Sequence, residues 1–221
     1  MGKLIVLEGL DGSGKGTHAG LLAKRLFKEG QKVKKITFPD YKERSSEPVK
    51  MYLAGEFGKK PGDVNAYAAS SFYAVDRFAS YKKFWQTFYE EDGIIIADRY
   101  TTSNATHQMG KLPLEEWDAF LEWLEDYEYH KLGLPRPDVT LYLDMDPDIS
   151  QKLMTGRYHG DEGKKDIHEK DLSYLRFCRK SALYAGDHWG WKTVHLCDEK
   201  RAFSIEENAD RIYQIVKKEV F

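Results

Sequence analysis

The feature that most constrains this fold is a glycine-rich run near the start of the chain, from Gly9 to Thr17, which reads GLDGSGKGT. The apolar segment 4–7 precedes it, and a segment with helical periodicity follows it. A strand, a glycine loop and a helix in this order form a phosphate cradle, because the loop turns N–H groups inward and the helix N-terminus adds partial positive charge. A chance glycine turn with a lysine is the alternative, and both flanks argue against it.

The loop is therefore expected to hold a nucleoside triphosphate, with the lysine ammonium reaching the transferable phosphate. The expected triphosphate-binding residues are Gly9, Gly12, Ser13, Gly14, Lys15, Gly16 and Thr17. Gly16 stands where a Ser or Thr would offer its hydroxyl to magnesium, and Thr17 comes one residue later. The loop predicts phosphate binding but leaves the first metal ligand undetermined.

Length and charge narrow the class of protein. The 221 residues suffice for one well-buried core, so we expect a single domain over residues 1–221. With 34 basic against 36 acidic residues, the net charge of -2 argues against sequence-independent nucleic-acid binding. Cys178 and Cys197 form no CxxC or zinc spacing, so both are expected to be reduced and buried. No apolar run is long enough for a signal peptide or a membrane span, which predicts a cytoplasmic protein.

Short apolar segments alternate with longer helical ones, the pattern of a parallel sheet covered on both faces. The expectation is an α/β fold of three layers, with five parallel strands between helices. The five predicted strands are Lys3 to Glu8, Val33 to Phe38, Ile94 to Asp98, Val139 to Asp144 and Lys192 to Cys197. Their continuous apolarity fits burial on both faces of the sheet.

Helix signals separate these strands. Residues 17–28 place Leu22 and Leu26 on one face, and Gly30 follows as a stop. Asp146-Pro147 marks a helix start, and Ser204 with Glu207 forms a capping box for the last helix. Two further predicted helices have apolar residues at three- and four-residue steps, which form one apolar face on each. In the first, within residues 65–91, this face consists of Ala74, Phe78, Tyr81, Trp85 and Phe88. In the second it consists of Leu114, Trp117, Leu121 and Leu124.

Residues 155–170 are rich in charge and poor in large apolar side chains, which predicts a mobile lid. Arg157 and Lys165 are the cations that such a lid would bring to a transferred phosphoryl group. An exposed loop without a role is the alternative, since charge runs are often only solvated. His168-Glu169 begins like a zinc-protease motif, but Leu172 stands at the second histidine position, so we reject a zinc site.

A second chemical cluster follows the third predicted strand, where Asp98, Arg99 and Tyr100 come at its carboxyl end. Ligands of open parallel sheets bind at that edge. Asp98 is a candidate for holding magnesium, and Arg99 offers a planar fork to a phosphate. The alternative is a structural Asp-Arg ion pair at a strand end.

A third cluster lies on the predicted helix 65–91, where Tyr73 and Arg77 are four residues apart and share a face. A ring beside a guanidinium can stack on a base and hold a phosphate. By itself the pair is weak evidence for a nucleotide site, because an aromatic residue and an arginine at this spacing also pack on each other or on the core.

Four blocks of the chain together resemble the thymidylate kinase family. They are Glu8 to Lys15 (EGLDGSGK), Tyr73 to Arg77 (YAVDR), Asp98 to Tyr100 with Ser103 to Ala105, and Pro137 to Asp144 (PDVTLYLD). The blocks occur in the right order and extend from the first predicted strand to the fourth. The resemblance implies a P-loop kinase that transfers the γ-phosphoryl group of ATP to dTMP with Mg²⁺, giving dTDP for dTTP synthesis, in a cytoplasmic homodimer.

The resemblance also implies residue roles. Lys15 and the loop amides would hold the ATP phosphates, and Asp11 would orient the acceptor nucleotide. Arg77 and Arg99 would clamp dTMP, and Tyr73 would stack on thymine where the family usually has Phe. The implied sets are, for catalysis, Lys15, Arg99, Arg157 and Lys165; for the acceptor, Asp11, Tyr73, Arg77, Arg99, Tyr100, Ser103, Asn104 and Gln108; and for the metal, Asp98.

The chain departs from the family pattern at three places. Gly16 replaces a hydroxyl residue, His107 stands where Tyr is common near the sugar, and the stretched loop 38–46 makes Arg44 a speculative phosphate contact. Two rival functions remain from the residues: a kinase of another nucleoside monophosphate, such as AMP or UMP, and a nucleotide-binding switch without turnover. The second would ordinarily carry an NKxD motif, which the sequence lacks.

Overall fold

The computed structural model describes residues 2–150, 172–198 and 201–221. The expected lid at 155–170, with Arg157 and Lys165, lies outside these residues. The strands are β1 Lys3–Glu8, β2 Val33–Thr37, β3 Ile94–Asp98, β4 Val139–Asp144 and β5 Lys192–His195. The helices are α1 Lys15–Lys28, α2 Glu47–Leu53, α3 Ala66–Ser80, α4 Gln86–Glu90, α5 Thr102–His107, α6 Trp117–Glu125, α8 Leu172–Trp189 and α9 Ile205–Val220.

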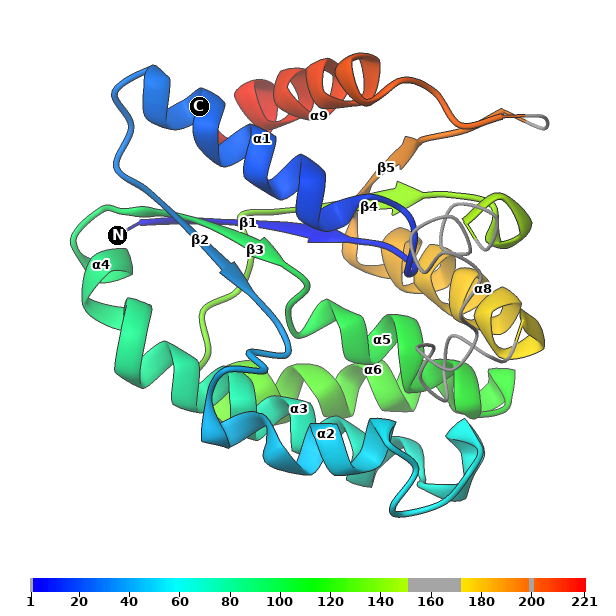
Figure 1. The fold of residues 1–221 in the computed structure, drawn as a ribbon. Coiled ribbons are helices and arrows are strands. Elements are labelled where there is room, and N and C mark those ends of the chain that lie inside the picture. Colours follow the sequence, from blue (N-terminus) through cyan, green and yellow to red (C-terminus); the bar gives the residue numbers. More distant parts are fainter. Residues whose placement is uncertain (1, 151–171, 199–200) are drawn as a thin grey trace.

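The strands form one parallel sheet in the order β2-β3-β1-β4-β5. This confirms the predicted five-stranded parallel sheet. The three inner strands begin and end where the sequence places them, whereas β2 and β5 end at Thr37 and His195, before the predicted limits. Because all strands run the same way, their carboxyl ends meet at one edge, and the glycine loop leaves β1 there (Figure 1).

Helices cover both faces of the sheet (Figure 1). On one face, Ile5 and Leu7 of β1 pack in a core with side chains of α1 and α9. On the other face, the alternate residues Leu4 and Val6 pack with aromatic residues such as Trp85. The alternation of β1 between two buried clusters is the physical reason for its unbroken apolar sequence.

The long helix predicted over residues 65–91 is interrupted. Asn65 caps α3 by accepting a hydrogen bond from the N–H of Ala68, and a π-helical segment, η3 Tyr81–Trp85, separates α3 from α4. The predicted apolar face is correct for Ala74, Tyr81 and Trp85 but wrong for Phe78, which is 39% exposed. Around Phe78, α3 buries Ala74, Arg77 and Ser80, so Phe78 lies beside the buried face of the helix and not on it.

The structure confirms some of the other helix predictions and contradicts others. The capping box of Ser204 and Glu207 is present at the start of α9, and residues 147–150 begin a helix after Asp146. Leu114 is half exposed, outside the apolar face that α6 buries. Both cysteines are free, but only Cys178 is fully buried. Over the residues that the structure describes, no helix is long and apolar enough to cross a membrane.

Candidate active site

The glycine loop has the backbone conformation that its sequence predicts. Gly9, Gly12 and Gly14 all have positive φ angles, where a side chain would be strained. A Cβ at Gly9 would also lie 2.7 Å from the carbonyl oxygen of Leu143 on β4. The loop leads directly into α1, whose first turn carries no acidic residue, so its free N–H groups are available to an anion.

The ammonium of Lys15 lies inside this loop. Its Nζ donates to the carbonyl oxygen of Leu10 at 2.7 Å and lies 3.7 Å from Oδ1 of Asp11. Burial and the nearby Arg99 cation lower the pKa of Lys15, although Asp11 opposes the shift. Lys15 is thus a buried cation near the carboxylates of Asp11, Asp98 and Glu8, and an anionic ligand would stabilise its charged form further.

Arg99 lies at the point where β3 ends. Its φ is 68°, unusual for a residue with a side chain, and its N–H donates to the carbonyl oxygen of Leu7 on β1. Its guanidinium donates to Asp11 Oδ1 at 2.7 Å and to His107 Nε2 at 2.8 Å. Burial disfavours the charged form, but Asp11 and Glu8 outweigh it and raise the pKa of Arg99.

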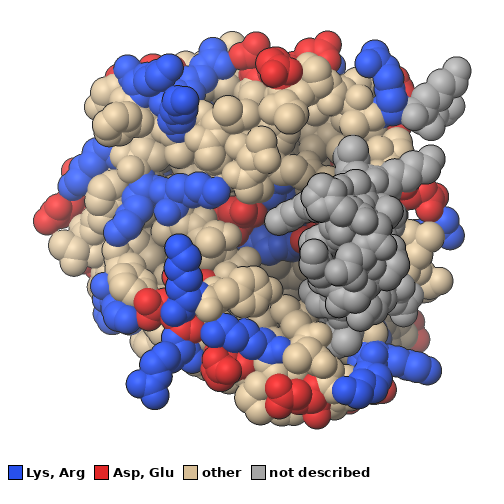
Figure 2. Space-filling model, in the orientation of Figure 1, with Lys and Arg blue, Asp and Glu red and all other residues tan. Residues whose placement is uncertain are grey.

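Asp11 lies between the two cations at the floor of the site. Burial raises its pKa, but Arg99 and Lys15 outweigh burial and hold that pKa well below its usual range. Figure 2 shows a hollow in this face of the molecule, between the parts formed by α1 and by α2 and α3, with basic and acidic side chains at its floor. The arrangement can hold two anionic groups side by side, one at the loop and one at Arg99.

Glu8 is a residue of the site that the sequence analysis quoted but did not assign. It is fully buried and accepts hydrogen bonds from the N–H of Gly9 at 2.9 Å and from the hydroxyls of Thr102 at 3.0 Å and Ser103 at 2.6 Å. Arg99 lies 3.4 Å away. Glu8 thus ties the glycine loop to α5. An acidic residue at the end of a buried strand is a signal that could have revealed it.

Arg77 of α3 lies apart from this floor, fully buried, in an ion pair with Glu128 of the π-helical segment η6 Asp126–Lys131. Its Nε and Nη2 donate to the two carboxylate oxygens at 2.7 and 2.5 Å, and its Nη1 donates to the carbonyl oxygen of Tyr100 at 3.3 Å. Burial disfavours the cation, but Glu128 outweighs it and raises the pKa of Arg77. Asn104 joins the pair by donating to Glu128 at 2.9 Å.

The remaining acceptor residues are divided between the site and the core. Tyr73 is half-buried, and its ring meets that of Tyr52 edge-on at 6.5 Å. Ser103 is bound to Glu8, and Oε1 of the buried Gln108 accepts no hydrogen bond from any described residue. The ring of Tyr100, in contrast, packs in the core against Trp85, and only its carbonyl oxygen faces Arg77.

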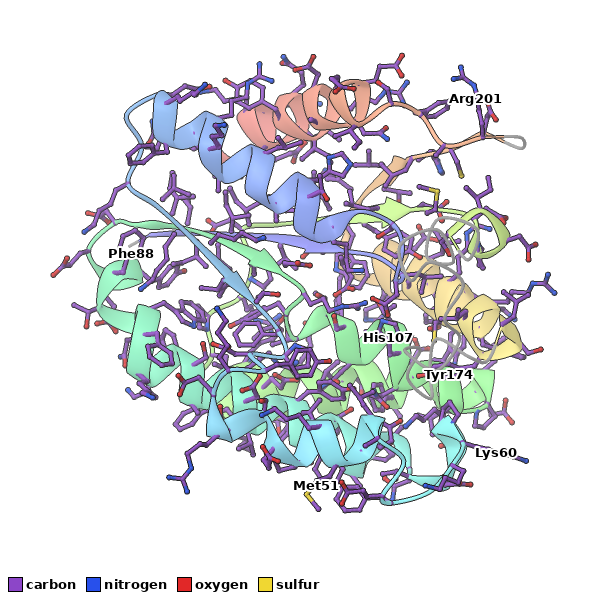
Figure 3. The ribbon with its side chains drawn as sticks, viewed as in Figure 1. Met51, Lys60, Phe88, His107, Tyr174 and Arg201 are labelled. Atoms are coloured by element: carbon purple, nitrogen blue, oxygen red, sulfur yellow. The ribbon has the colours of Figure 1, made fainter. Side chains whose placement is uncertain are left out.

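The hydroxyl of Tyr174 donates to the carbonyl oxygen of His107 at 2.6 Å (Figure 3). Tyr174 also packs with Leu10 of the loop and with Cys178. Tyr174 of α8 therefore contacts both α5 and the glycine loop. These segments are far apart in the sequence, and no local pattern predicts the contact.

Asp98 and Gly16 fit a magnesium ion bound to phosphates. A Cβ at Gly16 would lie 2.9 Å from Oδ2 of Asp98, so the missing side chain lets the carboxylate approach the loop. Among the described residues, no cluster of three or more His, Cys, Asp or Glu could hold a metal by itself. One carboxylate beside a triphosphate is the kind of site that Mg²⁺ uses, because the phosphates supply further oxygens.

Comparison with known proteins agrees with this geometry. A family model described as thymidylate kinase matches residues 7–206. The thymidylate kinase of Mycobacterium tuberculosis is 29% identical over 198 residues, covering 86% of this chain and 90% of the relative. That of Caenorhabditis elegans is 28% identical over 227 residues, covering 95% and 92%. The solved thymidylate kinase of Candida albicans has the same fold, with a TM-score of 0.71 at 21% identity over 98% of this chain and 92% of that one. This chain belongs to the thymidylate kinase family.

Proposed function

We propose that this protein is a phosphotransferase that moves the γ-phosphoryl group of ATP to dTMP and gives dTDP. The observation that carries the proposal is the pair of cations at the floor of the site, Lys15 in the loop and Arg99 at the end of β3, on either side of Asp11. Phosphoryl transfer needs positioning and charge neutralisation more than covalent chemistry. An acceptor phosphate is already an anion at neutral pH, so the site needs no general base.

The donor side is formed by the loop. Its glycine backbone and the N-terminus of α1 hold the ATP phosphates, and Lys15 exchanges its contact with Leu10 for a phosphate oxygen. Asp98, next to Gly16, would hold Mg²⁺, which would neutralise phosphate charge when bound. Ser13 and Thr17 complete the proposed ATP-binding run from Gly9 to Thr17.

The acceptor side uses the two arginines differently. Arg99, which exchanges Asp11 for a ligand, grips the dTMP phosphate. The charge of Arg77 is already balanced by Glu128, so its free N–H groups serve a neutral carbonyl of the base better than a phosphate. Tyr73 stacks on the thymine ring. Ser103, Asn104 and Gln108 line the pyrimidine pocket.

Several sequence predictions remain to be tested. Catalysis by Arg157, or by Lys165, falls on residues outside the described part of the chain, and so does the lid. The homodimer rests on the family resemblance, and the single domain on length. The cytoplasmic location agrees with two free cysteines. Light scattering on the purified protein would measure the oligomeric state directly.

The decisive experiment is a coupled ADP assay with ATP and Mg²⁺ over dTMP, dUMP, UMP and AMP. We expect dTMP to be the best acceptor, with measurable use of dUMP, because one methyl group discriminates by only about 1 to 3 kcal/mol. Lys15→Ala removes turnover. A preference for AMP or UMP, or ATP hydrolysis that is independent of dTMP, would contradict the proposal.

A further inference from the structure

The buried carboxylate of Glu128 has no role in the function proposed so far. It lies in η6, before β4, and is fully buried. Its two oxygens accept hydrogen bonds from Nε of Arg77 at 2.7 Å, from Nη2 of Arg77 at 2.5 Å and from Nδ2 of Asn104 at 2.9 Å. One side chain therefore holds two residues of the proposed pyrimidine pocket, and these come from two different helices.

The contacts of Asn104 determine which way round its amide lies. Its Nδ2 donates to Oε1 of Glu128 at 2.9 Å and to the carbonyl oxygen of Ser70 at 3.3 Å. A carboxylate and a carbonyl are acceptors only, so the amide cannot turn over without placing its oxygen against two other oxygens. The amide oxygen of Asn104 is thus the group left for a ligand, and no described residue donates to it.

Arg77 is held in the same way. Glu128 takes one N–H from Nε and one from Nη2, and Tyr100 takes one from Nη1. A guanidinium has five N–H groups, so Arg77 keeps one on each terminal nitrogen. The pocket therefore offers donors from Arg77 and an acceptor from Asn104.

This pattern distinguishes the pyrimidines. Thymine and uracil carry a carbonyl acceptor at C4 beside an N–H donor at N3. Cytosine carries an amino donor at C4 beside an unprotonated acceptor at N3, which is the reverse pattern. A pocket with donors from Arg77 and an oxygen from Asn104 complements the first pattern and leaves groups unpaired against the second.

We propose that Glu128 is a positioning residue that sets the selectivity of the acceptor site for bases with an N3–H, as in dTMP, over cytosine nucleotides. The inference rests on the proposed function, because Arg77 and Asn104 must face the base. Glu128 touches no substrate and acts through both residues. It aligns Arg77 as a neutralised donor and prevents the Asn104 amide from turning over.

The test is Glu128→Gln, assayed with dTMP and dCMP. Glutamine has the same shape but replaces one acceptor oxygen by an NH₂ donor. That donor must face either Nε–H of Arg77, the partner of Oε2, or the N–H groups of Arg77 Nη2 and Asn104 Nδ2, the partners of Oε1, so all three hydrogen bonds cannot be kept. We expect the ratio of kcat/KM for dTMP to that for dCMP to fall at least about tenfold. The fall is expected mainly in KM for dTMP, with kcat changed less.

Asp144→Asn is the matched control. Asp144 is a buried carboxylate that accepts from Nε and Nη2 of Arg179 at 2.7 and 2.9 Å, outside the proposed pyrimidine pocket. Its variant also removes a charge from a bidentate arginine pair. We expect it to lose stability without changing the dTMP to dCMP ratio.

A folded Glu128→Gln enzyme with the wild-type ratio would overturn the inference while leaving the proposed function intact. A wild-type enzyme that does not phosphorylate dTMP would instead remove the proposed function. If the variant does not fold, a crystal structure of the wild-type enzyme with dTMP decides. The inference requires that Nδ2 of Asn104 still donates to Glu128 and that the amide oxygen of Asn104 accepts from N3–H of the base. Separation of Glu128 from Asn104 in that complex would contradict it.

Discussion

Two buried carboxylates each accompany an arginine, yet the two arginines are held very differently. Glu128 meets Arg77 with two bonds of 2.7 and 2.5 Å, and the arginine side chain is 1% exposed. Glu8 lies 3.4 Å from Arg99, whose side chain is 14% exposed and whose shorter bond goes to Asp11. Glu8 is satisfied instead by the Gly9 N–H and by two hydroxyls.

The difference shows how a buried acid determines what its arginine can bind. A bidentate pair without solvent is already neutral, so Arg77 gains little from a phosphate. Arg99 lies at the floor of the site between two acids, and a phosphate can replace Asp11 as its partner. Four predictions test this difference between the two arginines, and those with the greatest expected change come first.

The first concerns stability. Glu128→Met leaves the Arg77 charge buried and alone, and we expect the free energy of unfolding to fall by about 3 to 5 kcal/mol in urea titrations. Arg77→Met made together with Glu128→Met should recover most of that loss, because an apolar pair replaces the ion pair. Asp210→Asn, in an exposed pair with Arg25, is the control and should change stability by less than about 1 kcal/mol. A single variant as stable as the control would show that the pair contributes nothing.

The second separates phosphate from base recognition. In calorimetric titrations with dTMP and thymidine, Arg99→Ala should weaken dTMP about 100-fold while changing thymidine little, since only dTMP carries the phosphate. Arg77→Lys keeps a charge opposite Glu128 but loses the planar fork, so it should weaken both ligands by a similar factor. If Arg77→Lys affected dTMP alone, Arg77 would be a phosphate ligand and the contrast between the arginines would fail.

The third concerns the floor near Asp98. A Cβ at Gly16 must displace Asp98, 2.9 Å away, whereas a Cβ at Gly20, also in α1, meets no described atom within 4 Å. We expect Gly16→Ala to lower kcat about 10-fold or more and to raise the Mg²⁺ concentration needed for half-maximal activity. Gly20→Ala should leave kcat unchanged and add about 0.5 to 1 kcal/mol of stability. Equal kinetics for the two variants would remove Asp98 from the proposed metal site.

The fourth uses pH. The raised pKa values of both arginines keep them charged near neutrality, but burial lowers the pKa of Lys111 from 10.5 to about 7. Its Nζ donates to the hydroxyl of Tyr52 at 2.8 Å and to the carbonyl oxygen of Val64 at 3.1 Å. Between pH 7 and 10.5 the unfolded chain binds a proton that the folded chain has released, so stability rises with pH in that window.

We expect Lys111→Met to remove about 2 kcal/mol of the rise in unfolding free energy between pH 7 and 9, measured by urea titration at each pH. Lys24→Met, at an exposed position of α1, should leave the rise in place. A rise that survives Lys111→Met would mean that another group titrates there.

Local signals were sufficient for much of the fold and for the placement of several candidate site residues at the edge of the sheet. The limits of β1, β3 and β4 follow from short apolar runs that end in a charged residue. The phosphate loop follows from glycines whose positive φ angles few other residues adopt. Asp98 and Arg99 follow because their strand must end at the ligand-binding edge of a parallel sheet.

The structure differs from the expected arrangement where a local pattern competes with packing. Phe78 continues the apolar spacing of α3, but α3 buries Arg77 and Ser80 instead and leaves Phe78 39% exposed beside its buried face. Tyr100 follows Arg99 in the motif, yet the positive φ of Arg99 turns the chain, and the Tyr100 ring enters the core.

The order of strands and helices, the phosphate loop and the family could all be predicted before folding was considered, because each depends on neighbouring residues and their spacing. Which acid accompanies which arginine depends instead on how the chain folds. Glu128 lies 51 residues from Arg77, and Glu8 lies 91 residues from Arg99. Nothing local to either arginine specifies such a partner, because the sheet order and the packing of α3, α5 and η6 bring the charges together. The proposed division between a phosphate-binding and a base-binding arginine therefore depends on the fold.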